Sequence, residues 1–481
     1  MTTGTARLSS GFCKRTRRGG TKLRIKHSVT FSLFLVCIPY LLHGSAQTAQ
    51  FLSFASAQPV LTAMRDSLPA ELKTSGPVTA DAWNEWVRSR DKEIRGRLEG
   101  GEEDTLTNLL RLGVTYTKQV RISLGDLERY GKDRAVDSIA ENRADDLIRA
   151  MAASHLSEGL LEMRTFLERK GFNLKTPEGQ KKVKAYMLAN LARERDEVLR
   201  WEAEVTSKNA NLYDAFRNRG ISTDSDLYPD YLIELHLRQM VEKGLLTPGA
   251  VHRVAIVGPG LDFVNKNYGS DFYPPQTTQP FAVIDSLVRL GLADPATIQL
   301  YTFDISPRVN RHIERARASA AAGKPYTVQL LCTPSERWEA SYHTGFLEYW
   351  QKFGNEIGKP AARIAAPAAA SEIWNRAVSI RPAVVERIIP VDMNVVYQTL
   401  TVPTEQQFDL VIGTNIFIYY GPLEQSLARV NLATMIKPGG FLITNEALSG
   451  AAPSKLADSL QTSVPVKPSD TEHMFTYVRQ K

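Results

Sequence analysis

Val254-Ala255-Ile256-Val257-Gly258-Pro259-Gly260-Leu261-Asp262 is the most informative segment of this 481-residue chain. Its four leading apolar residues predict a buried parallel strand, and the glycines that follow predict a tight turn. Glycine adds no side-chain bulk and tolerates positive φ, so a backbone with this turn can pass close to a nucleotide. The segment therefore predicts a strand that runs into a nucleotide-binding loop.

Three later segments extend this pattern in the same order along the chain. Tyr301-Thr302-Phe303-Asp304 is a short apolar segment that ends in an acid, and 408–415 is another that ends in Gly-Thr-Asn. Residues 436–443, Ile-Lys-Pro-Gly-Gly-Phe-Leu-Ile, form a turn followed by a strand. Together the four segments resemble the class I S-adenosylmethionine (SAM)-dependent methyltransferases. The resemblance implies an α/β, Rossmann-like, seven-stranded sheet, mostly parallel, with the first strand central and the last reversed, and SAM as the cofactor.

The charge of the chain is concentrated in its leader. Lys and Arg number 59 against 52 Asp and Glu, a formal net charge of +7, but residues 1–47 hold eight basic residues and no acid. The remainder therefore carries a net charge of about −1. A nucleic-acid-binding protein usually keeps a basic patch on its folded part, so overall charge gives no support to a nucleic-acid partner.

Residues 1–47 have the layout of a bacterial export signal. A basic region up to His27 precedes the apolar run 29–42, and small residues follow at 44–46. This run is too short for a comfortable membrane span and suits a signal peptide; an uncleaved anchor is the alternative. Both predict that the protein is periplasmic or secreted and meets a membrane only through the leader, whereas it is cytoplasmic if the leader has no such role.

Cysteine and histidine usage argues against a disulfide or a metal centre. Cys13 and Cys37 lie in the leader, so Cys332 is the only cysteine beyond it. The eight histidines are scattered, without the close pairing of common zinc motifs. We expect no bound metal.

The rest of the chain divides into three predicted parts. Residues 48–79 are rich in Ala, Ser, Thr and Pro and predict a linker. Residues 80–246 carry apolar residues at three- and four-residue steps, which predicts an all-helical domain. The breaker Leu246-Thr247-Pro248-Gly249 marks the boundary, and 247–481 is the predicted methyltransferase-like Rossmann domain.

Within 247–481, strands and helices alternate, which favours a parallel sheet covered by helices on both faces. The spacing predicts an insertion over 333–380, with a possible strand at 328–331 before it. A final antiparallel hairpin is predicted near 460–478. The predicted strands of the sheet are 253–257, 298–303, 387–391, 408–412 and 440–445, and the predicted helices are 280–290, 307–322 and 423–435.

Ligands of open α/β sheets lie at the carboxyl ends of the strands, and the predicted cofactor site gathers there. Gly258 and Gly260 let the backbone approach the aminoacid-sulfonium part of SAM. Asp304 ends the second strand, where its carboxylate can accept hydrogen bonds from both ribose hydroxyls. The alternative role for Asp304 is to cap the helix that begins at Ser306-Pro307.

Two further acids complete the predicted cofactor site. Asp392 ends the third strand, where the resemblance implies a contact with the adenine amino group, and Met393 packs on the adenine face. The alternative for Asp392 is an ordinary turn residue. Asp262 stands where the family has the third glycine of its loop, and 262–279 intervenes before the next helix as either a lid or a surface loop.

The segment 408–420, FDLVIGTNIFIYY, resembles the fourth strand of the chemotaxis-receptor glutamate methyltransferases. Asn415, Tyr419 and Tyr420 match that motif, whereas Thr414 stands where those enzymes have an arginine. The resemblance implies that the three matching residues orient a methyl acceptor, either a protein carboxylate or a small molecule. Tyrosines that follow a strand are as often part of the core.

Three hypotheses follow for the function. The first is an active SAM-dependent methyltransferase. The second is an exported, non-catalytic nucleotide-binding or interaction protein built on the same fold, because SAM is a cytosolic metabolite and the leader points outward. The third, a dinucleotide oxidoreductase, is the least supported, because the second Gly-x-x-Gly step of that fingerprint is missing.

Overall fold

A computed structural model describes residues 49–73, 76–206, 216, 219–263, 271–332, 338–449, 454–467 and 470–481. The predicted leader, residues 1–47, lies outside the described residues. Among the described helices none is long and apolar enough to cross a membrane. Residues Gln47–Lys481 form one unit by their mutual contacts.

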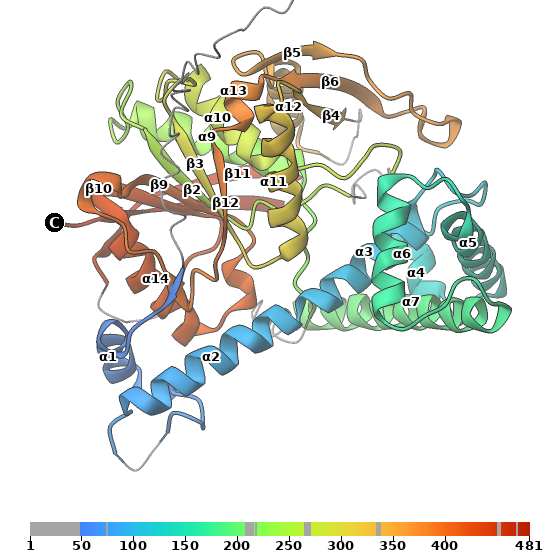
Figure 1. Ribbon diagram of the computed structural model, residues 1–481, viewed down its shortest axis with the longest axis horizontal. Coiled ribbons are helices and arrows are strands. Elements are labelled where there is room, and N and C mark those ends of the chain that lie inside the picture. The colour runs from blue at the N-terminus through green and yellow to red at the C-terminus, as the bar shows by residue number, and fades with distance from the viewer. Residues whose placement is uncertain are drawn as a thin grey trace, which may run out of the picture. The chain divides into compact units, whose positions relative to one another are not determined.

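A seven-stranded sheet organises the second half of the chain (Figure 1). Its strand order is β11-β12-β10-β9-β2-β3-β7. Within this sheet β10, β9, β2, β3 and β7 pair in parallel, and β12 is antiparallel to both of its neighbours. The strands are β2 (Arg253–Val257), β3 (Gln299–Asp304), β7 (Ile388–Asp392), β9 (Phe408–Gly413), β10 (Ile436–Thr444), β11 (Leu456–Lys467) and β12 (Asp470–Arg479). The prediction of a mostly parallel sheet with its first strand central and its last strand reversed is confirmed.

The register of the central strands brings their polar ends to one edge. Val257 of β2 lies opposite Phe303 of β3 and Gly413 of β9, while Asp304 of β3 lies opposite Asp392 of β7. The residues that follow these strands therefore emerge side by side. At the other end of β2, the carboxylate of Asp409 accepts hydrogen bonds from the backbone N–H groups of residues 252 and 253, at 2.6 and 2.7 Å.

Alternate residues of the sheet are buried in two separate apolar clusters, one on each face, and helices cover both (Figure 1). Val254 and Ile256 belong to one cluster, and Ala255 and Val257 to the other. The covering helices are α9 (Leu227–Glu242), α10 (Gln279–Arg289), α11 (Pro307–Ala321), α13 (Pro382–Val385) and α14 (Pro422–Met435). Burial on both faces explains why β2 is a continuous apolar run.

The predicted insertion, residues 333–380, supplies two strands of a second, smaller sheet, and the third strand of that sheet precedes the insertion. The three strands are antiparallel, in the order β4-β6-β5, and α12 (Ala340–Lys352) lies between β4 and β5 in the chain. The strands are β4 (Tyr326–Cys332), β5 (Gly358–Ala361) and β6 (Trp374–Ile380). The strand predicted at 328–331 therefore exists, outside the main sheet.

Of the predicted helical domain, residues 80–246, the part 80–206 contains six helices in the described residues. The helices are α2 (Ala80–Gly96), α3 (Leu98–Leu112), α4 (Leu124–Arg129), α5 (Arg134–Ala152), α6 (Glu158–Arg169) and α7 (Pro177–Thr206). A third apolar cluster joins α3, α5, α6 and α7 through residues such as Leu110, Leu147 and Phe166. Helix α9 differs, because it packs against α10 and shares the core of the main sheet.

The segment predicted as a linker, 48–79, is partly folded, which corrects that expectation. β1 (Gln50–Phe51) pairs with β8 (Gln398–Thr399), and α1 (Phe54–Ala63) contacts α14. Ala57, Val60 and Leu61 are buried there. Three- and four-residue spacing of apolar side chains within an Ala- and Ser-rich stretch is enough to bury one face of a short helix.

Candidate functional site

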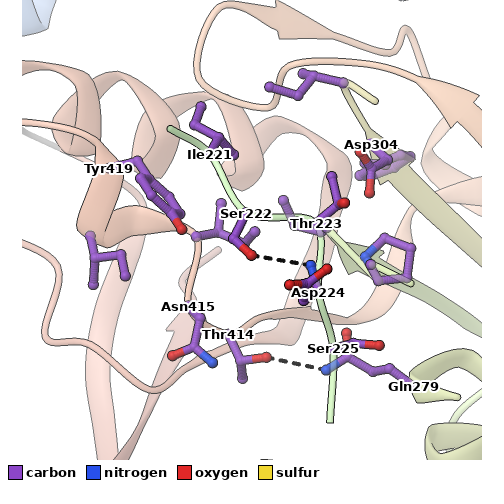
Figure 2. Close-up of a pocket in the computed structure, with 18 of the residues that line it drawn as sticks. Ile221, Ser222, Thr223, Asp224, Ser225, Gln279, Asp304, Thr414, Asn415 and Tyr419 are labelled. Atoms are coloured by element: carbon purple, nitrogen blue, oxygen red, sulfur yellow. Dashed lines mark hydrogen bonds between the residues drawn. The ribbon is translucent and has the colours of Figure 1, made fainter. Parts of the chain in front are cut away.

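A cavity of about 380 Å³ opens at the carboxyl ends of β2, β3, β7 and β9. This volume lies within the range of small-molecule sites. The cavity is lined by the residues that follow the four strands and by a segment that crosses above them (Figure 2). Of the predicted site residues, seven line it: Gly258, Gly260, Asp304, Met393, Asn415, Tyr419 and Tyr420.

The glycine turn has the geometry that its sequence predicts. Gly258 and Gly260 have φ values of 65° and 67°, a region that other residues rarely adopt. A Cβ on Gly258 would lie 2.2 Å from the Cδ1 atom of Ile416, and one on Gly260 would lie 2.6 Å from the carbonyl oxygen of Thr223. Both glycines are therefore required by the backbone conformation and by close neighbours.

The segment 221–226, here called the strap, crosses the glycine turn and forms one wall of the cavity (Figure 2). The backbone N–H of Leu261 donates to the carbonyl of Thr223 at 2.6 Å, and the N–H of Ser225 donates to the carbonyl of Leu261 at 3.1 Å. No pattern in the sequence predicts the strap. Its run of Ser, Thr and Asp before a helix predicts a cap at most, and Asp226 does cap α9 by accepting from the N–H of Tyr228.

Asp304 occupies the floor of the cavity with 7% of its surface exposed. Its carboxylate accepts a hydrogen bond from the backbone N–H of Ser306 at 2.7 Å and interacts with the backbone of Gly260. Burial, opposed by these hydrogen bonds, raises the pKa of Asp304 to about 7. The alternative of a helix cap is wrong, because Ser306 is the N-cap of α11 and accepts from the N–H of Val309.

Asp392 is not one of the described residues that line the cavity, so the structure does not bring it together with the other predicted cofactor residues. Its side chain is 57% exposed, and its Oδ1 atom lies 2.6 Å from Nη1 of Arg95 in α2. Two residues further on, Asn394 lines the cavity with 1% of its surface exposed. The Asn394 Oδ1 atom accepts from the N–H of Val396 at 3.1 Å, which fixes the orientation of the amide, and no described group accepts a hydrogen bond from its Nδ2 atom.

Asp262 is likewise not among the described residues that line the cavity, so the structure does not place it with the other predicted cofactor residues. Its buried carboxylate accepts from the hydroxyl of Tyr273 at 2.6 Å and from Nε2 of Gln276 at 3.0 Å. Burial raises the pKa of Asp262 to about 7. Backbone hydrogen bonds join residues 262 and 276, so Asp262 anchors the segment 262–279 to the glycine turn. Residues 264–270 of that segment lie outside the described residues.

Asn415 has the only positive φ, 58°, among the described residues other than glycine. Two hydrogen bonds with Asn445 hold it. The backbone N–H of Asn415 donates to Oδ1 of Asn445 at 2.7 Å, and Nδ2 of Asn445 donates to Oδ1 of Asn415 at 2.7 Å. A strained residue at the end of a central strand is a common feature of functional sites. The pairing means that Asn415 meets the cavity in a fixed orientation.

Tyr419 and Tyr420 are both buried and both line the cavity. The hydroxyl of Tyr420 lies 3.4 Å from Oδ1 of Asn394, a weak contact. The ring of Tyr419 packs edge-on against Phe216 at 5.8 Å, below the guanidinium of Arg97. The two tyrosines thus belong to the core and also line the cavity, and their role in orienting an acceptor stays a prediction.

Comparison with known proteins adds no family assignment. No family model and no curated protein matches the chain. Among solved structures, the N-methyltransferase NodS from Bradyrhizobium japonicum WM9, in complex with S-adenosyl-L-homocysteine (SAH), is 12% identical, with 56% of this chain and 100% of that chain covered and a TM-score of 0.26. Magnesium protoporphyrin IX methyltransferase from Synechocystis PCC 6803 with bound SAM is 12% identical, with 57% and 99% covered and a TM-score of 0.26. A TehB-like SAM-dependent methyltransferase from Corynebacterium glutamicum is 9% identical, with 60% and 99% covered and a TM-score of 0.24. At these identities and TM-scores the likeness assigns no function to this chain.

Proposed function

We propose that the protein is a SAM-dependent methyltransferase that binds its cofactor in the cavity beside the glycine turn. The observation that carries this proposal is the position of Asp304. Its buried carboxylate ends β3, beside Gly258 and Gly260, in a cavity of ligand size. A carboxylate there can accept hydrogen bonds from two ribose hydroxyls, and hydrogen bonds to charged groups are worth roughly 1.5–3 kcal/mol each.

The other residues of the cavity fit this cofactor. Met393 offers an apolar surface for adenine, and the buried Nδ2 atom of Asn394 needs an acceptor that an adenine ring nitrogen can supply. A buried donor left without a partner costs stability, so this atom favours a ligand. When bound, SAM supplies a methyl group that is already activated on a sulfonium. The chain then has to position the acceptor and exclude water.

The acceptor is either a protein carboxylate or a small molecule in this proposal. Asn415, Tyr419 and Tyr420 are the residues proposed to orient it, because all three line the cavity. The likeness of 408–420 to the chemotaxis-receptor glutamate methyltransferases supports a protein carboxylate. Export through the leader also belongs to the proposal, and it requires SAM to reach the protein outside the cytoplasm or the protein to have lost catalysis.

Calorimetry with the full-length chain tests the proposal. A fragment beginning near residue 246 is unsuitable, because α9 and α1 bury apolar side chains against the sheet domain. We expect SAM and SAH to bind with one site and NAD not to bind. Asp304→Asn should bind SAH at least about tenfold more weakly, by the loss of one charged hydrogen bond.

Asp262→Asn is the matched control, because it removes an equally buried carboxylate that does not line the cavity. It should bind SAH as the wild type does. Binding of NAD in preference to SAM would replace the proposal with the oxidoreductase hypothesis. The absence of heat with either ligand at millimolar concentration would leave the non-catalytic hypothesis in the lead.

A further inference from the structure

Two adjacent glycines, Gly100 and Gly101, lie in the first turn of α3, where the chain leading into the strap passes over that helix. A glycine inside a helix is less stable than an alanine by about 1 kcal/mol, so packing has to require such a pair. A Cβ on Gly101 would lie 1.9 Å from the carbonyl oxygen of Ile221, and one on Gly220 would lie 2.2 Å from the carbonyl carbon of Gly100. The two backbones therefore cross at a point where neither side has room for a side chain. We call Gly100, Gly101 and Gly220 the glycine crossing.

Hydrogen bonds and burial fix the strap against α3 at this crossing. The carbonyl oxygen of Arg97 accepts a hydrogen bond from the backbone N–H of Ile221 at 3.1 Å. One turn further along the helix, the hydroxyl of Thr105 lies 3.2 Å from Oδ1 of Asp224. Ile221 itself is 7% exposed and lines the cavity. The strap thus begins from a position that α3 determines.

The side chain of Arg97, the residue between α2 and α3, joins the same place to the cavity wall. Its guanidinium donates hydrogen bonds to the carbonyl oxygens of Phe216 at 2.6 Å, Arg219 at 3.0 Å and Tyr419 at 3.3 Å. It also lies over the ring of Tyr419, 5.7 Å from the ring centroid. Because a guanidinium is a rigid, planar fork of donors, these bonds fix both segments relative to each other. Phe216 and Tyr419 both line the cavity.

The strap is also bonded to the glycine turn that it crosses (Figure 2). Backbone hydrogen bonds join residues 223 and 225 to Leu261, and a Cβ on Gly260 would lie 2.6 Å from the carbonyl oxygen of Thr223. Close-packed elements transmit a displacement to their neighbours. A shift of the strap on α3 therefore reaches the turn beside which the cofactor is proposed to bind.

We infer that residues 97–101, the α2–α3 junction, are a positioning element of the site. They seat the strap and so set the shape of the cavity at the glycine turn. Arg97 and Gly101 are the positioning residues, and the helical region serves the site through them. Such positioning matters because a displacement of about 1 Å in a site can cost on the order of a hundredfold in rate. The effect on SAH binding rests on the proposed function, whereas the seating of the strap does not.

Alanine variants of the glycine crossing test the inference in the full-length protein. Gly101→Ala and Gly220→Ala add one methyl group from opposite sides of the same contact, where backbone atoms leave no room. Gly96→Ala is the matched control, because Gly96 is the last residue of α2 and nothing lies within 4 Å of a Cβ there. Each variant is measured by urea unfolding, by calorimetry with SAH, and by hydrogen–deuterium exchange with mass spectrometry of peptides covering 221–226 and 258–262.

We expect both crossing variants to bind SAH at least about tenfold more weakly than the wild type and to exchange faster in both peptides. A peptide covering 140–151 of α5, none of whose residues lines the cavity, should exchange at the wild-type rate. Gly96→Ala should match the wild type in SAH affinity and in exchange. A contact that served stability alone would lower the free energy of unfolding and leave SAH affinity and local exchange unchanged.

Arg97→Lys tests the junction without adding a methyl group at the crossing. Lysine keeps the positive charge but lacks the planar fork, so it cannot hold three carbonyl groups in the same arrangement. This variant should bind SAH at least about threefold more weakly and exchange faster at 221–226, from the loss of one or more hydrogen bonds. Arg149→Lys is the matched control, because Arg149 of α5 is 75% exposed, and it should behave as the wild type does.

Wild-type SAH affinity and wild-type exchange at 221–226 in both Gly101→Ala and Gly220→Ala overturn the inference. If neither variant folds, Arg97→Lys decides, and wild-type behaviour of that variant overturns it. Failure of the proposed function is a different result, in which the wild type itself binds no SAH. Exchange at 258–262 then decides alone: faster exchange in the crossing variants, but not in Gly96→Ala, supports the seating of the strap by α3, and unchanged exchange overturns it.

Discussion

The raised pKa of Asp304 makes cofactor binding depend on pH. Burial raises this pKa to about 7, and ribose hydroxyls donate to the ionised carboxylate. If only the ionised form binds SAH, affinity follows the ionised fraction, which is about 9% at pH 6 and about 91% at pH 8. The dissociation constant should therefore fall about tenfold between these two values of pH.

Calorimetry at pH 6, 7 and 8 measures this change, and Asp304→Asn isolates it. SAH has titrating groups of its own, but they affect binding to the wild type and to Asp304→Asn equally. The ratio of the wild-type affinity to the variant affinity at each pH therefore cancels their contribution. Asp262→Asn should keep the slope of the wild type, because Asp262 titrates near the same pH and does not line the cavity. A wild-type slope no steeper than that of Asp304→Asn would refute the assignment of the ribose contact.

Three further predictions concern the fold that supports the site. Gly260→Ala places a Cβ 2.6 Å from the carbonyl oxygen of Thr223 at a φ of 67°. This variant should lower the free energy of unfolding, measured in urea, by about 2 kcal/mol and should weaken SAH binding. Gly249→Ala has a similar φ but open space around it, so it should lower the free energy of unfolding by about 1 kcal/mol. Burial lowers the pKa of His236 to about 4, below its value in the unfolded chain, so the protein should lose stability as pH falls from about 6.5 towards 4. His236→Gln should reduce this loss of stability by up to roughly 3 kcal/mol, and thermal unfolding at pH 4.5 and pH 7.5 measures the difference. Arg143 is fully buried and donates hydrogen bonds to four backbone carbonyls between residues 110 and 120. Arg143→Leu should therefore lower the free energy of unfolding by about 3 kcal/mol or more in a urea titration. A loss below about 1 kcal/mol would show that water replaces the guanidinium as the partner of these carbonyls.

The sheet could be predicted from the sequence because its signals are local. The apolar run 254–257 is buried on both faces, and the glycines after it are required by their φ values. Pro307 after Ser306 marks the start of α11 within the sequence itself. Such features depend on neighbours in the chain, so one sequence suffices to place them.

The side chains of the site were harder to predict because their partners are distant in sequence. Asp392 ends its strand as expected, but Arg95, 297 positions earlier, holds its carboxylate away from the cavity. The strap reaches the glycine turn through backbone hydrogen bonds that no side-chain pattern encodes. Asn394 becomes notable only once its amide is seen to be buried without a partner for Nδ2.

A crystal structure of the full-length protein with SAH tests the central claim most directly. The account predicts SAH in the cavity, with both ribose hydroxyls about 2.5–3.0 Å from the carboxylate oxygens of Asp304 and the adenine against Met393 and Asn394. SAH bound elsewhere on the chain, or in the cavity with its ribose away from Asp304, would contradict it.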